Sequence, residues 1–91
     1  MNTIKKYIFH TDDGHGWLEI PVNEIPKSLL PQISKFSYRN LSTAYLEEDC
    51  DAPLIMHALN INNEQIEEQH KDESFVRRLP NFYFYNEEGA R

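Results

Sequence analysis

The sequence has few of the features that mark secreted, membrane or repeat proteins. Its one cysteine, Cys50, cannot form an internal disulfide bond, and the segment 1–13 lacks the apolar core and the small-residue cleavage site of a secretory signal. No apolar run approaches the roughly 20 residues that span a bilayer. Internal repeats and low-complexity stretches are also absent. We therefore expect a cytoplasmic protein with no membrane contact.

Basic residues are scarce as well. Nine lysines and arginines stand against 15 aspartates and glutamates, which gives a formal net charge of −6. This charge repels phosphate backbones and favours basic partners, so direct nucleic-acid binding is not expected. The chain has no serine elbow, no glycine-rich phosphate loop and no basic active-site cluster. The carboxylates that flank Cys50 oppose its ionisation. We predict no catalytic residue and no cofactor.

What the chain does contain is enough for one modest hydrophobic core. The chain is 40% hydrophobic and 12% aromatic, which is enough for such a core. Its length of 91 residues is too short for the two helix layers around a parallel sheet that nucleotide-binding folds need. We predict a small single α+β domain over 1–85, with a frayed tail over 86–91. Its antiparallel β-hairpins, of four to five strands, should pack with one main helix and one or two short helices.

Two hairpins are predicted. Strands over 4–10 and 17–22 flank Asp13-Gly14, a sequence typical of a type I′ turn in which glycine takes positive φ, and Gly16 suggests a bulge. In the second strand, alternation places Leu18, Ile20 and Val22 on one face of the sheet. Trp17 and Glu19 then point to the opposite face. The second hairpin joins the alternating residues Phe36 and Tyr38 to a strand over 43–47.

The main helix is predicted to start at Asp51, as N-cap, with Pro53 in its first turn. Its apolar stripe consists of Leu54, Ile55, Ala58, Leu59 and Ile61. Asn23 should cap a short helix whose length Pro31 limits and whose apolar residues are Ile25, Leu29 and Ile33. Ser74 should cap a single helical turn that ends at Pro80 and carries Phe75, Val76 and Leu79. The nearly all-polar stretch 62–72 is compatible with a helix extension, an edge strand or a loop, and of these we favour an edge strand. An extended aromatic segment is expected over 82–85.

The stretch HTDDGHGW raises the question of a binding site. His10, Asp12, Asp13 and His15 offer imidazole and carboxylate ligands for zinc or a similar metal, with His57, His70 and Cys50 as distant candidates. A polar hairpin turn explains the same residues. Trp17 either closes a second small core or stands exposed as an anchor for a partner.

Four carboxylates stand together before the main helix: Glu47, Glu48, Asp49 and Asp51. Helix capping needs one or two of them, so we expect a solvated or partner-facing acidic patch, with a hard cation as the alternative. Arg77-Arg78 either pairs with this patch or contacts an acidic partner. An acid/base pair of His15 with Glu47 would need only spatial proximity.

Four segments, HTDDGHGWLEI, ISKFSY, AYLEEDCDAPL and SFVRRL, resemble in this order a group of small uncharacterised proteins of bacteriophages, prophages and plasmids. The resemblance extends to about Leu79 and implies no established activity. It marks as motif positions His10, Asp12, Gly14, His15, Gly16, Trp17, Tyr38, Tyr45, Glu47, Glu48, Asp49, Asp51 and Arg77. This mixture of residue types favours one shared surface formed by the 10–17 stretch and the acidic 47–51 stretch.

From the charge and this resemblance we predict an accessory protein, monomeric or homodimeric, that binds a host protein or complex and inhibits a defence system such as CRISPR or restriction. The partner-binding residues are predicted to be His10, Asp12, His15, Trp17, Tyr38, Tyr45, Glu47, Glu48, Asp49, Asp51 and Arg77. One alternative is a metal-dependent hydrolytic or nuclease-like accessory enzyme that uses His10, Asp12, His15 and the carboxylates at 47–51. Another is a regulatory module that oligomerises through an edge strand.

Overall fold

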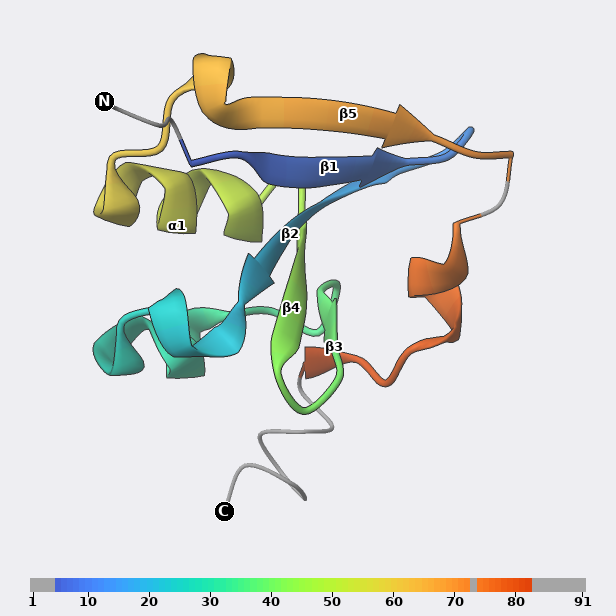
Figure 1. Ribbon diagram of the computed structural model, residues 1–91. Coiled ribbons are helices and arrows are strands. Elements are labelled where there is room, and N and C mark those ends of the chain that lie inside the picture. The colour runs from blue at the N-terminus through green and yellow to red at the C-terminus, as the bar shows by residue number, and fades with distance from the viewer. Residues whose placement is uncertain (1–4, 73, 83–91) are drawn as a thin grey trace.

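A computed structural model describes residues 5–72 and 74–82. Within these residues, five strands form one mixed sheet in the order β3-β4-β2-β1-β5, with one α-helix and four short 3-10 helices around it (Figure 1). The predicted small α+β domain is confirmed. The strands are β1 (Tyr7–Thr11), β2 (Gly16–Pro21), β3 (Tyr38–Arg39), β4 (Thr43–Glu47) and β5 (Ile66–His70), and the α-helix is α1 (Asp51–Leu59).

The first hairpin forms as predicted, but its turn has another basis. No glycine among the described residues has a positive φ, so the type I′ prediction is wrong. Instead, the Asp12 carboxylate closes the turn: its Oδ1 accepts hydrogen bonds from the backbone N–H groups of Gly14 and His15, each at 3.0 Å. A side-chain acceptor can replace a backbone turn in this way.

Gly16 is needed for close approach and not for a bulge, since it pairs in regular register with Thr11. A Cβ added at Gly16 would lie 2.6 Å from Cε2 and 2.7 Å from Cζ of the Phe9 ring. We therefore expect Gly16→Ala to lower the free energy of unfolding by about 1–3 kcal/mol, the usual cost of overpacking. Urea denaturation measures it, with Phe9→Leu in the Gly16→Ala background expected to restore part of the loss. An unchanged stability of Gly16→Ala would mean that the Phe9 ring moves aside freely.

The second hairpin and the edge strand are confirmed. Strands β3 and β4 pair antiparallel, and β5 lies beside β1 but parallel to it, with Thr11 opposite His70. The residues of β5 after Ile66 are exposed. Adjacent carboxylates on an edge strand, here Glu67 and Glu68, disfavour pairing with a second sheet.

Helix α1 forms, but Asp51 is not its N-cap. Cys50 holds that position, without a side-chain hydrogen bond, and Asp51 is the first helical residue. Of the predicted stripe, Ile55 is fully buried whereas Ala58 is exposed. The helix ends at Asn60, which adopts the left-handed conformation with φ 57°.

The connection before β3 consists of two 3-10 helices, η1 (Val22–Glu24) and η2 (Lys27–Gln32), in place of the predicted α-helix. Asn23 lies inside η1 and caps nothing, so that prediction is wrong. Pro31 inside η2 is consistent with the absence of a longer helix, since proline removes a backbone donor. Ile25 and Ile33 still reach the core.

The main core lies on one face of the sheet, which α1 and the η1–η2 segment cover (Figure 1). Sheet residues Leu18, Ile20 and Leu46 pack there against Ile55 of the helix. Phe82 also enters this core and is fully buried. The remainder of the predicted 82–85 segment and the 86–91 tail lie outside the described residues.

The other face is covered by the first part of residues 74–82, which we call the strap and whose Val76 and Leu79 pack with Trp17 (Figure 1). Its turn η4 (Phe75–Arg78) starts as predicted at Ser74, whose hydroxyl accepts from the Val76 N–H. The strap then reaches β3, where Arg39 N–H donates to the Pro80 carbonyl at 3.0 Å. No helix within 5–72 or 74–82 has the length and apolar character needed to cross a membrane.

Candidate functional site

The sheet register aligns three of the predicted residues on the strap face. His10 in β1 stands opposite Trp17 in β2, and Trp17 stands opposite Glu47 in β4. Directly opposed residues share a face, so the HTDDGHGW and YLEED stretches meet in one row across three strands. The hydrogen bond from Glu48 N–H to the Gly16 carbonyl, 3.0 Å, extends this contact beyond the strands.

Trp17 closes a second small core, with only 2% of its surface exposed. It packs with Tyr45 and Val76, and the Tyr38 ring meets it edge-on at 6.1 Å between centroids. Within the described part of the chain, its indole Nε1 has no hydrogen-bond partner. A buried donor left unpaired costs about 1–3 kcal/mol.

A cavity of about 440 Å³ opens beside this tryptophan. We call it the Trp17 cavity. It lies between the strap, the end of β4 and the loop that precedes β3, and it combines aromatic rings with charges of both signs. Its lining residues are His15, Trp17, Lys35, Phe36, Tyr38, Glu47, Asp49, Cys50 and Arg77.

Arg77 on one wall is fixed by Asp12. Its Nε lies 2.6 Å from Asp12 Oδ2 and its second terminal nitrogen 3.0 Å from Oδ1, a bidentate pair, while the guanidinium stands 5.2 Å from the Trp17 ring centre. Arg77 thus pairs with Asp12, which lies outside the 47–51 stretch that was predicted as its intramolecular partner. The Arg77 guanidinium holds the pKa of the Asp12 carboxyl well below its usual range.

The opposite wall is fixed by Asp51. This buried carboxylate accepts from the N–H and the hydroxyl of Ser34, and from the hydroxyl of Ser37. The two serines bracket Lys35 and Phe36, which line the cavity. Phe36 is 59% exposed, so its ring is available to a ligand or partner.

Glu47 and His15 come together as the acid/base hypothesis required, with 3.8 Å between Glu47 Oε2 and His15 Nδ1. Glu47 Oε1 is occupied by the Asp49 N–H at 2.8 Å and by the Cys50 thiol at 3.3 Å. Partial desolvation raises the pKa of Cys50, and its hydrogen bond to Glu47 adds to the effect. A thiol in this state is a poor nucleophile.

Three of the predicted metal ligands, His10, Asp12 and His15, do not converge. His10 Nε2 pairs with Glu19 Oε1 at 2.6 Å, Asp12 pairs with Arg77, and His15 faces Glu47. The acidic patch also needs correction, because Glu47 and Asp51 are buried and hydrogen-bonded, and only Glu48 and Asp49 are exposed.

Six of the predicted partner-binding residues line the Trp17 cavity: His15, Trp17, Tyr38, Glu47, Asp49 and Arg77. The others do not line it, namely His10, Asp12, Tyr45, Glu48 and Asp51. Sequence reasoning missed Lys35, Phe36 and Cys50 as lining residues. The two serines around Lys35 and Phe36 were a signal for a tightly held loop, but their acceptor, Asp51, is distant in the sequence.

No family model, curated protein or solved structure was found to match this chain. The resemblance to phage and plasmid proteins therefore stays a prediction.

Proposed function

We propose that this chain is a small accessory protein that attaches to a partner protein through the Trp17 cavity. The observation that carries the proposal is the convergence of the 10–17 and 47–51 stretches on one cavity, which Trp17, Tyr38 and Arg77 line. Tryptophan, tyrosine and arginine are the residues that most often dominate binding energy at interfaces, and all three line this cavity.

The lining defines the chemistry of the partner. Phe36, Tyr38 and Trp17 line the cavity with aromatic rings, of which the exposed Phe36 ring offers the most surface for an apolar side chain. Exposed Asp49 lines the cavity and favours a basic group on the partner. A protein segment that inserts an apolar side chain and is flanked by lysine or arginine meets these requirements.

The resemblance to phage and plasmid proteins directs the choice of partner. Small acidic proteins of mobile elements commonly work by binding host proteins, so complexes of bacterial defence, such as CRISPR and restriction enzymes, are the first targets to test. The action would then be inhibition by occupation of a protein surface in the bacterial cytoplasm.

The decisive experiment compares two exposed apolar residues. Phe36 lines the cavity, whereas Leu41, 79% exposed, lies in the β3–β4 turn and does not line it. A tagged wild-type chain is used to capture partners from bacterial lysate, and the purified partner is then titrated by calorimetry. We expect Phe36→Ala to weaken binding at least tenfold and Leu41→Ala to leave the Kd within about twofold, since interface anchors contribute roughly 1–2 kcal/mol or more.

Trp17→Phe provides a second test, because it keeps aromatic packing and removes only the indole N–H and some volume. Trp17→Ala is unsuitable, since emptying this core would cost about 3–5 kcal/mol and confuse folding with binding. Equal binding by wild type, Phe36→Ala and Trp17→Phe would contradict the proposal. The same holds if Leu41→Ala alone loses the partner.

A further inference from the structure

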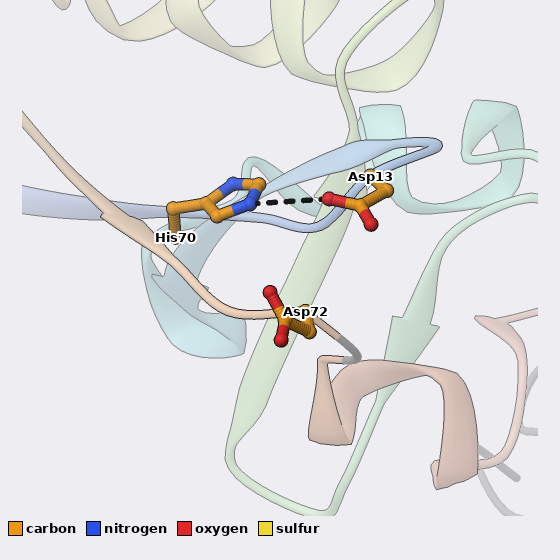
Figure 2. A group of neighbouring side chains, drawn as sticks. All are labelled: Asp13, His70 and Asp72. Carbon is orange, nitrogen blue, oxygen red and sulfur yellow. Dashed lines mark ion pairs between the residues drawn. The ribbon is translucent and has the colours of Figure 1, made fainter.

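We propose that Asp13, His70 and Asp72 form a Zn²⁺ site at the corner where the β1–β2 turn meets the end of β5. One donor atom from each residue can be chosen so that all three lie within 4.8 Å of one another. His70 Nε2 is 3.3 Å from Asp13 Oδ1, and Figure 2 shows the imidazole and both carboxylates around a common space. The site is separate from the Trp17 cavity and shares none of its lining residues.

An oriented imidazole distinguishes this site from an ordinary group of surface carboxylates. His70 Nδ1 is 2.8 Å from the hydroxyl oxygen of Thr11, which lies outside the ligand set. This hydrogen bond fixes the ring so that Nε2 faces Asp13. A metal-binding histidine usually donates its other ring N–H to a neighbouring acceptor, which fixes the ring direction. Zn²⁺ on Nε2 would require the His70 Nδ1–H to donate to the Thr11 hydroxyl oxygen, whose own proton has Glu68 Oε2 as an acceptor at 3.4 Å.

The backbone holds the ligands in place although Asp13 is far from the others in the sequence. Strands β1 and β5 are parallel, with Thr11 opposite His70, and Lys71 N–H donates to the Thr11 carbonyl at 3.0 Å. The β1–β2 turn that carries Asp13 is held by the Asp12 carboxylate, which accepts from the N–H groups of Gly14 and His15. The exposed side chains can close the remaining separation by small rotations, because donors around zinc lie about 2.0–2.2 Å from the ion.

The donor set favours zinc over magnesium or calcium. One imidazole nitrogen with two carboxylate oxygens suits a borderline divalent ion, whereas hard cations prefer oxygen donors alone. Three protein ligands leave further coordination positions for water. Two neighbouring carboxylates also repel each other, and a divalent cation between them removes this repulsion.

Titration of the untagged full chain with ZnCl₂ by calorimetry tests the site. We expect one equivalent of Zn²⁺ to bind, with at least tenfold weaker binding in both His70→Ala and Asp13→Asn. His57 on α1 is also exposed and serves as the matched control, so His57→Ala should change the affinity by less than twofold. Thr11→Val should weaken binding about tenfold by releasing the ring.

A residue-specific readout separates this site from the other histidines. In ¹⁵N-labelled wild type, Zn²⁺ should shift the Nε2 resonance of His70 and leave those of His10, His15 and His57 in place. Absence of saturable binding in the wild type would overturn the proposal. It would also be overturned by one equivalent of Zn²⁺ that binds unchanged to His70→Ala, or by a shift confined to another histidine.

Discussion

Asp12→Ala is expected to lower the free energy of unfolding by about 3 kcal/mol, measured by urea denaturation at pH 7. The carboxylate accepts from the backbone N–H groups of Gly14 and His15 and binds Arg77 with both oxygens. Its side chain is only 2% exposed. Removal leaves these donors without their acceptor in a largely buried place, at about 1–3 kcal/mol for each group that water cannot reach. For a domain of this size the melting temperature should fall by more than about 12 °C.

The same pair gives the protein an acid dependence. Arg77 holds the pKa of the Asp12 carboxyl well below its usual range, and the turn N–H groups of Gly14 and His15 act in the same direction. A carboxyl whose pKa is lower in the folded state contributes stability above its unfolded pKa, near 4, and this contribution is lost as the pH falls from about 5. We expect Asp12→Asn to show a flatter loss of stability between pH 6 and pH 3 than wild type.

Asp13→Ala is the control. The Asp13 carboxylate is next to Asp12 in the sequence, but it is 80% exposed and lies outside the hydrogen bonds that Asp12 makes in the turn. It should change the stability at pH 7 by less than about 0.5 kcal/mol in metal-free buffer. Parallel pH profiles of wild type and Asp12→Asn would contradict the role given to the Asp12–Arg77 pair. A loss in Asp13→Ala as large as that in Asp12→Ala would also contradict it.

Local patterns in the sequence were sufficient for most elements of the fold. Alternation around Leu18 and Ile20 predicts strand β2 and its buried face, and Ser74 and Pro80 bracket the turn η4. These signals act within a few residues of one another. The edge strand β5 was also predicted, although its parallel pairing with β1 depends on a long connection that no local pattern specifies.

The site was predictable only in part, because the partners of its polar residues are distant in the sequence. Asp12 precedes Arg77 by 65 residues and Asp51 follows Ser34 by 17. From the sequence alone, both aspartates resembled exposed groups available to a partner. The structure shows them as buried acceptors that fix the cavity walls, a role that depends on tertiary packing.

Asp51→Ala is the second change expected to have a large effect, at about 3 kcal/mol of unfolding free energy. Its carboxylate is 3% exposed and accepts from three donors of Ser34 and Ser37. Ser37 is itself fully buried, and its hydroxyl oxygen accepts from the Glu47 N–H at 2.9 Å. Loss of the carboxylate therefore leaves a buried hydroxyl and a backbone N–H unpaired, whereas exposed Asp49→Ala should cost less than about 0.5 kcal/mol.

A double-mutant cycle decides whether Asp51 and Ser37 act as one unit. Residues in one hydrogen-bond network are coupled, so Asp51→Ala with Ser37→Ala should cost at least 0.5 kcal/mol less than the sum of the single changes. Additive costs would contradict a direct link. Because this network anchors the loop that carries Phe36, Asp51→Asn should also weaken partner binding while Phe36 itself is unchanged. Asp51 would then contribute to recognition by positioning a cavity wall, without contact with the partner.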